Sequence, residues 1–247
     1  MVLKQLTPFG VVENGPSKLT EKETAMQSDN NGGNDSHSKR SILKWTAGVG
    51  SAFAVMGILP NFGISRALAA NLGRGDIGVL NYAYALEQLE AAFYSQVLKT
   101  PYRNMSDKEN DILSDIRDHE VEHRNFLREA LGNNAIGNLK VNFAAVNFQD
   151  RSSVLTTART FEDLGVSAYN GAGKLLKKAD YLLAAGKIVS VEARHAATIR
   201  DLIKPLSSSF AGSDVINNQG LDKARTPAAV LQAAKPFIKT PITMNRL

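Results

Sequence analysis

Two motifs occur twice in this chain, in the same order, and their repetition limits the folds that the chain can adopt. The segment LEQLEAAFYSQ at 86–96 aligns with FEDLGVSAYNG at 161–171, at an offset of 75 positions. The segment HEVEHRNFLRE at 119–129 aligns with VEARHAATIRD at 191–201, at an offset of 72 positions. Two motifs that recur in one order are hard to obtain by chance, so we expect two related halves.

Hydrophobic periodicity and helix-end signals predict four long helices. Ser106 is followed three residues later by Glu109, which is a capping box at the start of a helix. Gly132 and Pro205 mark two helix ends. The connection over 132–149 is long, whereas the connection within each helix pair is short. We therefore expect an all-α four-helix bundle with one long crossover between the helix pairs and a C-terminal extension. The expected helices span about 76–99, 107–131, 152–178 and 181–204.

The repeated motifs place ionisable side chains among apolar neighbours. In each half, one helix carries a Glu and, about two turns later, a Tyr on the same face. The next helix carries Glu-x-x-His, whose two members are also neighbours on one face. Carboxylates on an inward face are costly when unpaired, and two divalent or trivalent cations would compensate them. The expected metal ligands are Glu87, Glu120, His123, Glu162, Glu192 and His195.

The phrases LEQLEAAFY, DHEVEHRNFL, FEDLGVSAY and VEARHAATIRDL resemble the ferritin-like superfamily over about 74–204, and especially its exported bacterial branch, which is related to desiccation-associated proteins. The resemblance implies a site for two Fe ions, or alternatively Mn, with all six ligand positions filled. It makes Glu120 and Glu192 the bridging carboxylates and Glu87 and Glu162 the terminal ones, with one His on each metal. The cysteine-rich rubredoxin module of a rubrerythrin is missing.

Two residues beside these ligands have competing interpretations. His119 completes a His-Glu-x-x-His match, which on a helix holds zinc in some proteases. The repeat places Val191 opposite His119, so we expect this histidine at the edge of the site or on the helix surface. Glu90 lies three residues after Glu87 and could compete with it as a ligand. The repeat places Gly165 opposite Glu90, so we expect a solvated helix carboxylate.

The repeated tyrosines and the set of six ligands also have alternative readings. Tyr94 and Tyr169 are candidates for a catalytic role, either hydrogen-bonding the ligands or carrying a radical, or they are core residues with satisfied hydroxyls. The six ionisable residues could also form a buried ion-pair network in a bundle that has lost its metal.

Composition narrows the chemistry further. The chain has no Cys, so His and carboxylate must hold any transition metal, and these ligands suit iron and manganese. The formal net charge of +5 comes without a Lys/Arg block, which argues against a nucleic-acid partner. Three functions remain: an Fe(II)-oxidising enzyme that consumes O2 or peroxide in stress protection, peroxide dismutation at a di-manganese pair, and a non-catalytic envelope protein that binds metal during desiccation.

The N-terminal part of the chain has the order of an export signal. Lys39 and Arg40 precede an uncharged apolar run, and a small-x-small pattern, Ala-Leu-Ala, follows it. The stretch SKRSILK resembles a twin-arginine motif with Lys39 in place of the first arginine. We expect a mature protein that begins near Ala70, without a stable membrane partner, in the periplasm or cell envelope. An uncleaved signal would anchor the protein in the membrane.

The chain is expected to have four parts. These are a polar disordered lead at 1–37, an export signal at 38–69, the bundle at 70–205, and a C-terminal loop and short helix at 206–247. We expect the C-terminal part to pack on the bundle or to form a homo-oligomer contact.

Overall fold

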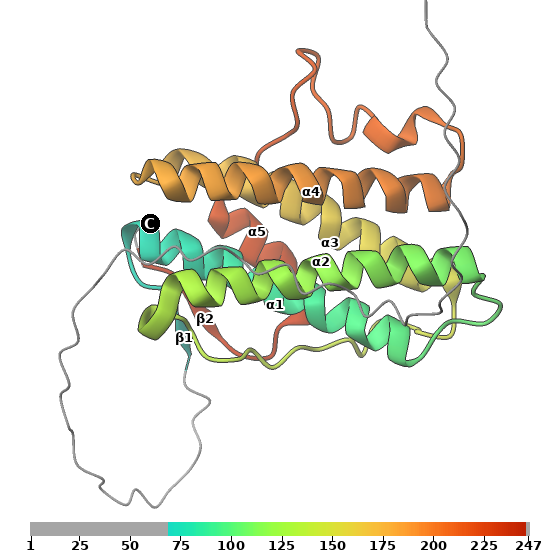
Figure 1. Ribbon diagram of the computed structural model, residues 1–247, viewed down its shortest axis with the longest axis horizontal. Helices are drawn as coiled ribbons and strands as arrows, with labels where there is room; N and C mark the ends of the chain where they lie inside the picture. Colours follow the sequence, from blue (N-terminus) through green and yellow to red (C-terminus); the bar gives the residue numbers. More distant parts are fainter. Residues whose placement is uncertain (1–68, 246–247) are drawn as a thin grey trace, which may run out of the picture. The chain divides into compact units, whose positions relative to one another are not determined.

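The computed structural model describes residues 69–245 (Figure 1). Four long helices dominate this part of the chain and confirm the expected all-α bundle with one long crossover between the helix pairs. The predicted polar lead at 1–37 and the predicted signal up to residue 68 lie outside the described residues. The α-helices are α1 Gly75–Lys99, α2 Asp107–Leu131, α3 Arg151–Ala172, α4 Ala179–Ile203 and α5 Pro227–Ala234, and short 3-10 turns span Gly132–Asn134, Gly173–Leu175, Ser208–Ala211 and Lys235–Phe237.

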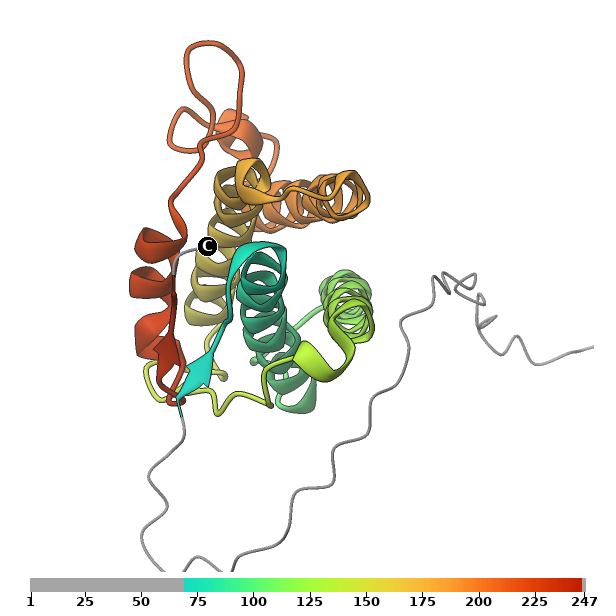
Figure 2. The same cartoon turned by 90° about the vertical axis from the view of Figure 1, so that its left-hand side faces the viewer.

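The long helices pack in two pairs, α1 against α2 and α3 against α4, and the pairs meet through α1 and α3 (Figure 2). The crossover between α2 and α3 contributes Phe143 and Phe148, whose rings meet Phe93 of α1. Phe93 also meets Phe161 of α3 edge-on, with ring centroids 5.1 Å apart. An aromatic cluster therefore joins the crossover to both central helices.

The C-terminal extension covers the side of the central helices that faces away from α2 and α4 (Figure 2). Helix α5 packs on α3 with Val230 fully buried, and the ring of Phe237 meets that of Phe161 at a centroid distance of 4.7 Å. Where the extension passes α3, a Cβ atom at Gly171 would overlap the carbonyl oxygen of Arg225. Glycine at this position therefore allows the extension to approach the helix closely.

Two short parallel strands, β1 Ala70–Asn71 and β2 Ile242–Thr243, join the start of the described chain to its end. The Ala70 amide donates to the carbonyl oxygen of Pro241 at 2.7 Å, and the Leu72 amide donates to that of Thr243 at 3.0 Å. Leu72 is fully buried at this junction. Of the helices in the described part of the chain, none has the length and apolar character needed to cross a membrane.

The third helix ends at Ala172 instead of near Lys178, where its periodicity predicted the end. A 3-10 turn follows it, and the next helix begins at Ala179. Asp76 of α1 accepts the backbone N–H groups of Lys177 at 2.8 Å and Lys178 at 3.0 Å, so a carboxylate from another helix satisfies amides at the start of α4. This contact is tertiary, and helical periodicity does not reveal it.

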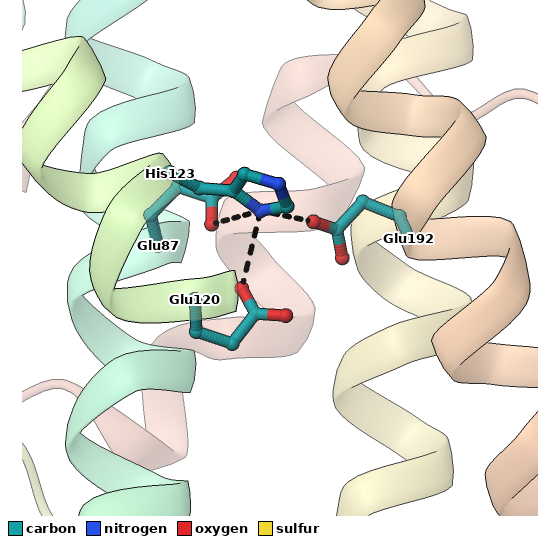
Figure 3. Close-up of side chains that lie close together, drawn as sticks. All are labelled: Glu87, Glu120, His123 and Glu192. Atoms are coloured by element: carbon teal, nitrogen blue, oxygen red, sulfur yellow. Dashed lines mark ion pairs between the residues drawn. The ribbon is translucent and has the colours of Figure 1, made fainter. Parts of the chain in front are cut away.

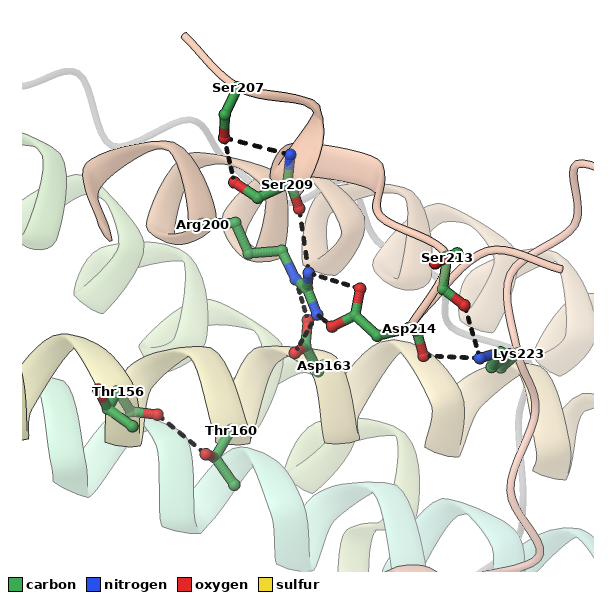
Figure 4. Close-up of polar contacts among 9 residues, drawn as sticks. All are labelled: Thr156, Thr160, Asp163, Arg200, Ser207, Ser209, Ser213, Asp214 and Lys223. Atoms are coloured by element: carbon green, nitrogen blue, oxygen red, sulfur yellow. Dashed lines mark hydrogen bonds and ion pairs between the residues drawn. The ribbon is translucent and has the colours of Figure 1, made fainter. Parts of the chain in front are cut away.

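A buried arginine fixes the loop that follows α4 (Figure 4). Arg200 is 4% exposed, and its guanidinium donates to both carboxylate oxygens of Asp163 on α3 and of Asp214 in the loop. It also donates to the carbonyl oxygen of Ser209 at 3.0 Å. The equivalent residue in the first half, Arg128, is exposed. This clamp is therefore a feature of the second half only.

Candidate metal centre

The four long helices bring all six predicted ligands together in the interior of the bundle. Helices α1 and α3 each contribute one glutamate, whereas α2 and α4 each contribute a Glu-x-x-His pair, as the helical spacing requires. All four glutamates are fully buried, His195 is 4% exposed, and the His123 side chain is 13% exposed. The residues brought together are Glu87, Glu120, His123, Glu162, Glu192 and His195.

The six side chains form two overlapping groups, in each of which the potential ligand atoms lie within 4.8 Å of one another. Glu87 and His123 belong to the first group, which Figure 3 draws from α1, α2 and α4. Its counterpart contains the equivalent glutamate and histidine of the second half. Glu120 and Glu192 belong to both groups. This sharing is the arrangement expected of bridging carboxylates, and the bridging role itself stays a prediction.

Each histidine lies among carboxylates from several helices. Nδ1 of His123 lies 2.9 Å from Glu192 Oε1, 3.5 Å from Glu87 Oε2 and 3.7 Å from Glu120 Oε2 (Figure 3). Nδ1 of His195 has the matching environment, 2.8 Å from Glu120 Oε1 and 3.5 Å from Oε2 of the α3 glutamate. Each imidazole therefore contacts the bridging candidate of the opposite helix pair most closely.

These contacts do not satisfy the buried polar atoms. Nδ1 of each histidine lies close to carboxylate oxygens, but none of these contacts has the geometry of a hydrogen bond. Leaving such atoms buried and unpaired costs free energy, which one cation within each group would offset. The donor set therefore fits a pair of metal ions. The unpartnered buried atoms are Glu87 Oε2, both oxygens of Glu120 and of Glu192, Glu162 Oε2, and Nδ1 of His123 and of His195.

The two repeated tyrosines cross-link the halves of the site. The Tyr94 hydroxyl on α1 donates to Glu162 Oε1 on α3 at 2.5 Å, and the Tyr169 hydroxyl on α3 donates to Glu87 Oε1 on α1 at 2.5 Å. Both tyrosines are buried. Each hydroxyl thus occupies one oxygen of a terminal glutamate and leaves the other oxygen free to face the group centre. Hydrogen bonding to the ligands, one of the two roles considered for these residues, agrees with this geometry.

His119 lies beside the site and outside both groups of potential ligands. Its Nδ1 atom is 3.0 Å from Nε2 of His195, the ring nitrogen that faces away from the carboxylates. A zinc site of the His-Glu-x-x-His type needs both histidines of the motif on one ion. The structure instead places His119 against the ring of a histidine from the other half, so it does not support the zinc-protease interpretation.

Glu90 contradicts the expectation of a solvated carboxylate. It is 3% exposed and lies one turn after Glu87 on the buried helix α1. Burial and then the charge of Glu192 raise the pKa of Glu90 well above its ordinary value. The sequence held one signal for this placement, which is Gly165 at the equivalent position of the second half. Because glycine has no side chain, the carboxyl group of Glu90 has room to extend from α1 to the surface of α3 at Gly165.

Burial and mutual contact shift the pKa values of several groups in the site. Burial raises the pKa of Glu120 to about 7, although the two histidines lower it. Burial favours a neutral imidazole at His195, but Glu120 and Glu162 outweigh burial and raise its pKa to about 10. The carboxylates raise the pKa of His123 in the same way. Since metal binding requires neutral imidazole and ionised carboxylate, binding must release protons.

A family model described as a ferritin-like domain matches residues 75–205. The matched segment runs from the first residue of α1 to just beyond the end of α4, and it includes all six residues of the two ligand groups. No curated protein matches the chain significantly.

Proposed function

The chain belongs to the family of ferritin-like domains, and on that premise we propose that it binds two iron ions and oxidises Fe(II) with O2 or peroxide. The observation that carries the proposal is the convergence of unpartnered, buried oxygen and nitrogen atoms in two groups that share Glu120 and Glu192. A site of carboxylate and imidazole without Cys suits iron or manganese. When bound, two such ions supply one-electron chemistry toward O2 or peroxide.

The residues of the site would have different roles as ligands of these ions. Glu120 and Glu192 would contact both ions, because each belongs to both groups. Glu87 and Glu162 would each contact one ion, and Tyr169 and Tyr94 hold their other oxygens in place. The surrounding apolar core excludes bulk water, so the charges act in a medium of low dielectric constant.

The test is metal loading followed by a turnover assay on one preparation. The metal-free protein is loaded with Fe(II) or Mn(II) under anaerobic conditions, and elemental analysis should give about two ions per chain, as the two groups imply. Addition of peroxide or O2 should then consume the oxidant in proportion to the Fe(II) supplied.

Two variants test whether metal loading and turnover depend on the shared glutamates. Glu120→Gln combined with Glu192→Gln should abolish both metal loading and turnover, because neutral amides replace both shared ligands. Glu122→Gln is the matched control on the same helix, since this side chain is exposed and belongs to neither group. Manganese loading with release of O2 from peroxide would favour the dismutase alternative, and loading without turnover would favour the non-catalytic one. Failure to load any metal would refute the proposal.

We also propose that the protein works outside the cytoplasm, in the periplasm or cell envelope. Support comes from the basic-apolar-small order of the N-terminal sequence. Ala69, where the small-x-small pattern ends, is exposed and directly precedes strand β1. A peptidase would thus find its cleavage point outside the core of the bundle.

A further inference from the structure

The two histidines of the centre differ in what lies behind their rings. Nε2 of His195, which faces away from the carboxylates, lies 3.0 Å from Nδ1 of His119. Among the described residues, none is hydrogen-bonded to the ring of His123, whose Nδ1 has only the close carboxylate contacts. The repeat places Val191 opposite His119, and a valine side chain neither accepts nor donates a hydrogen bond. The two halves of the centre therefore differ at this position.

The rings of His119 and His195 meet edge to edge. The ring planes differ by 9° and the ring centres are 5.2 Å apart, whereas the facing nitrogens are only 3.0 Å apart. Each of these nitrogens therefore points toward the other ring, nearly in the plane of both rings. This is the geometry of a hydrogen bond between two imidazoles. Because His195 is only 4% exposed, water competes little for the contact.

The nitrogen that faces the carboxylates determines the direction of this hydrogen bond when a metal is bound. A neutral imidazole binds a metal through the nitrogen that has no proton, and its other nitrogen carries the proton. Nδ1 of His195 lies among the ligand oxygens, 2.8 Å from Glu120 Oε1. Nε2 of His195 must therefore be the donor and Nδ1 of His119 the acceptor. His119 is exposed, so its own Nε2–H group can hydrogen-bond to water.

We infer that His119 is a positioning residue for the metal position that contains His195: it accepts the Nε2–H group of this histidine, orients its ring and makes the two metal positions unequal. This inference rests on the proposed dinuclear site. An acceptor behind a metal-binding imidazole fixes the tautomer and makes the ring a stronger ligand, and loss of such a partner typically lowers metal affinity about 10–100-fold. Since Val191 supplies no acceptor for His123, the His195 position should bind a divalent cation more tightly than the His123 position.

The test is a stepwise calorimetric titration of the full chain with Mn(II) under anaerobic conditions. The unmodified protein should bind two ions in two steps of different affinity. His119→Val installs the side chain of the other half, so the tighter step should weaken about tenfold or more and the weaker step should stay unchanged. Glu129→Val is the matched control, because it places the same side chain at an exposed position of α2, and it should leave both steps unchanged.

A conservative variant separates hydrogen bonding from packing. His119→Asn keeps an oxygen close to the position of Nδ1, so it retains an acceptor and should recover most of the affinity that His119→Val loses. Equally weak binding in the two variants, or unchanged affinity in His119→Val, would overturn the inference while leaving the dinuclear site intact. Failure of the unmodified protein to bind two ions would instead refute the proposed function.

NMR of the metal-free protein with isotope-labelled histidine tests the same hydrogen bond without any metal. The Nε2 proton of His195 should exchange slowly with water, because the ring is buried and hydrogen-bonded. Exchange should become fast in His119→Val and stay slow in His119→Asn. Equal exchange rates in the unmodified protein and in His119→Val would show that His119 does not hold this proton and would overturn the inference.

Discussion

Removal of one hydroxyl group at Tyr94 should destabilise the bundle and weaken the metal centre. Tyr94→Phe deletes the donor that lies 2.5 Å from Glu162 Oε1 and leaves the ring in place. Both residues are fully buried, so water cannot replace the lost hydrogen bond. A hydrogen bond to a charged group contributes about 1.5–3 kcal/mol, and the free energy of unfolding of the metal-free protein should fall by that amount. Because Glu162 also loses its orientation, metal affinity should fall about tenfold or more.

Tyr82→Phe is the matched control for this prediction. Tyr82 lies on the same helix and is 1% exposed, but its hydroxyl has no hydrogen-bond partner among the described residues. Deleting this hydroxyl removes an unpaired buried group, so stability should be unchanged or slightly higher. Urea denaturation of both variants without metal, followed by competition with a metal chelator, measures the two effects. If Tyr94→Phe is as stable as Tyr82→Phe and binds metal as well, the tyrosine does not hold the glutamate.

Two further predictions concern pH and export. The melting temperature of the metal-free protein should fall as the pH rises from 6.5 to 10, because the folded chain holds a proton on His195 up to a pKa of about 10 and the unfolded chain loses it near 6.5. Calorimetric melts across this range measure the effect, and a flat profile, or one equally steep in the metal-loaded protein, would contradict it. Mass spectrometry of the exported protein should find a chain that begins near Ala70, and Lys39→Gln combined with Arg40→Gln should abolish export. An intact chain in the envelope, or export of the double variant, would contradict this.

The sequence predicted the ligand groups because their spacing is local. Glu-x-x-His and a Glu with a Tyr two turns later define faces of single helices, and the repeat supplied a second copy of each. Periodicity could not predict that each tyrosine binds the glutamate of the other half, because that contact depends on how α1 and α3 pack. Periodicity also could not predict the contact between His119 and His195, because it depends on how α2 and α4 pack.

The error at Glu90 has a specific physical cause. Helix α1 is buried on nearly all sides from Gly78 to Tyr94. Part of its cover comes from the crossover, where residues such as Phe143 pack on Phe93 without any periodic pattern that would reveal it. The local sequence around a polar residue on such a helix therefore predicts an exposed side chain. Burial of this kind becomes visible only when the segments distant in sequence are in place.

The parallel pairing of β1 with β2 joins two segments that are synthesised at different times. Residues 70 and 71 are made before the four long helices, whereas their partners at 242 and 243 are made after them. At about 5–20 residues per second, the segment after α4 takes several seconds to synthesise. The four long helices can pack during that time, whereas Leu72 and the α3 surface beneath Val230 must wait for the segment after α4. Closure of the molecule therefore follows synthesis of the four-helix bundle.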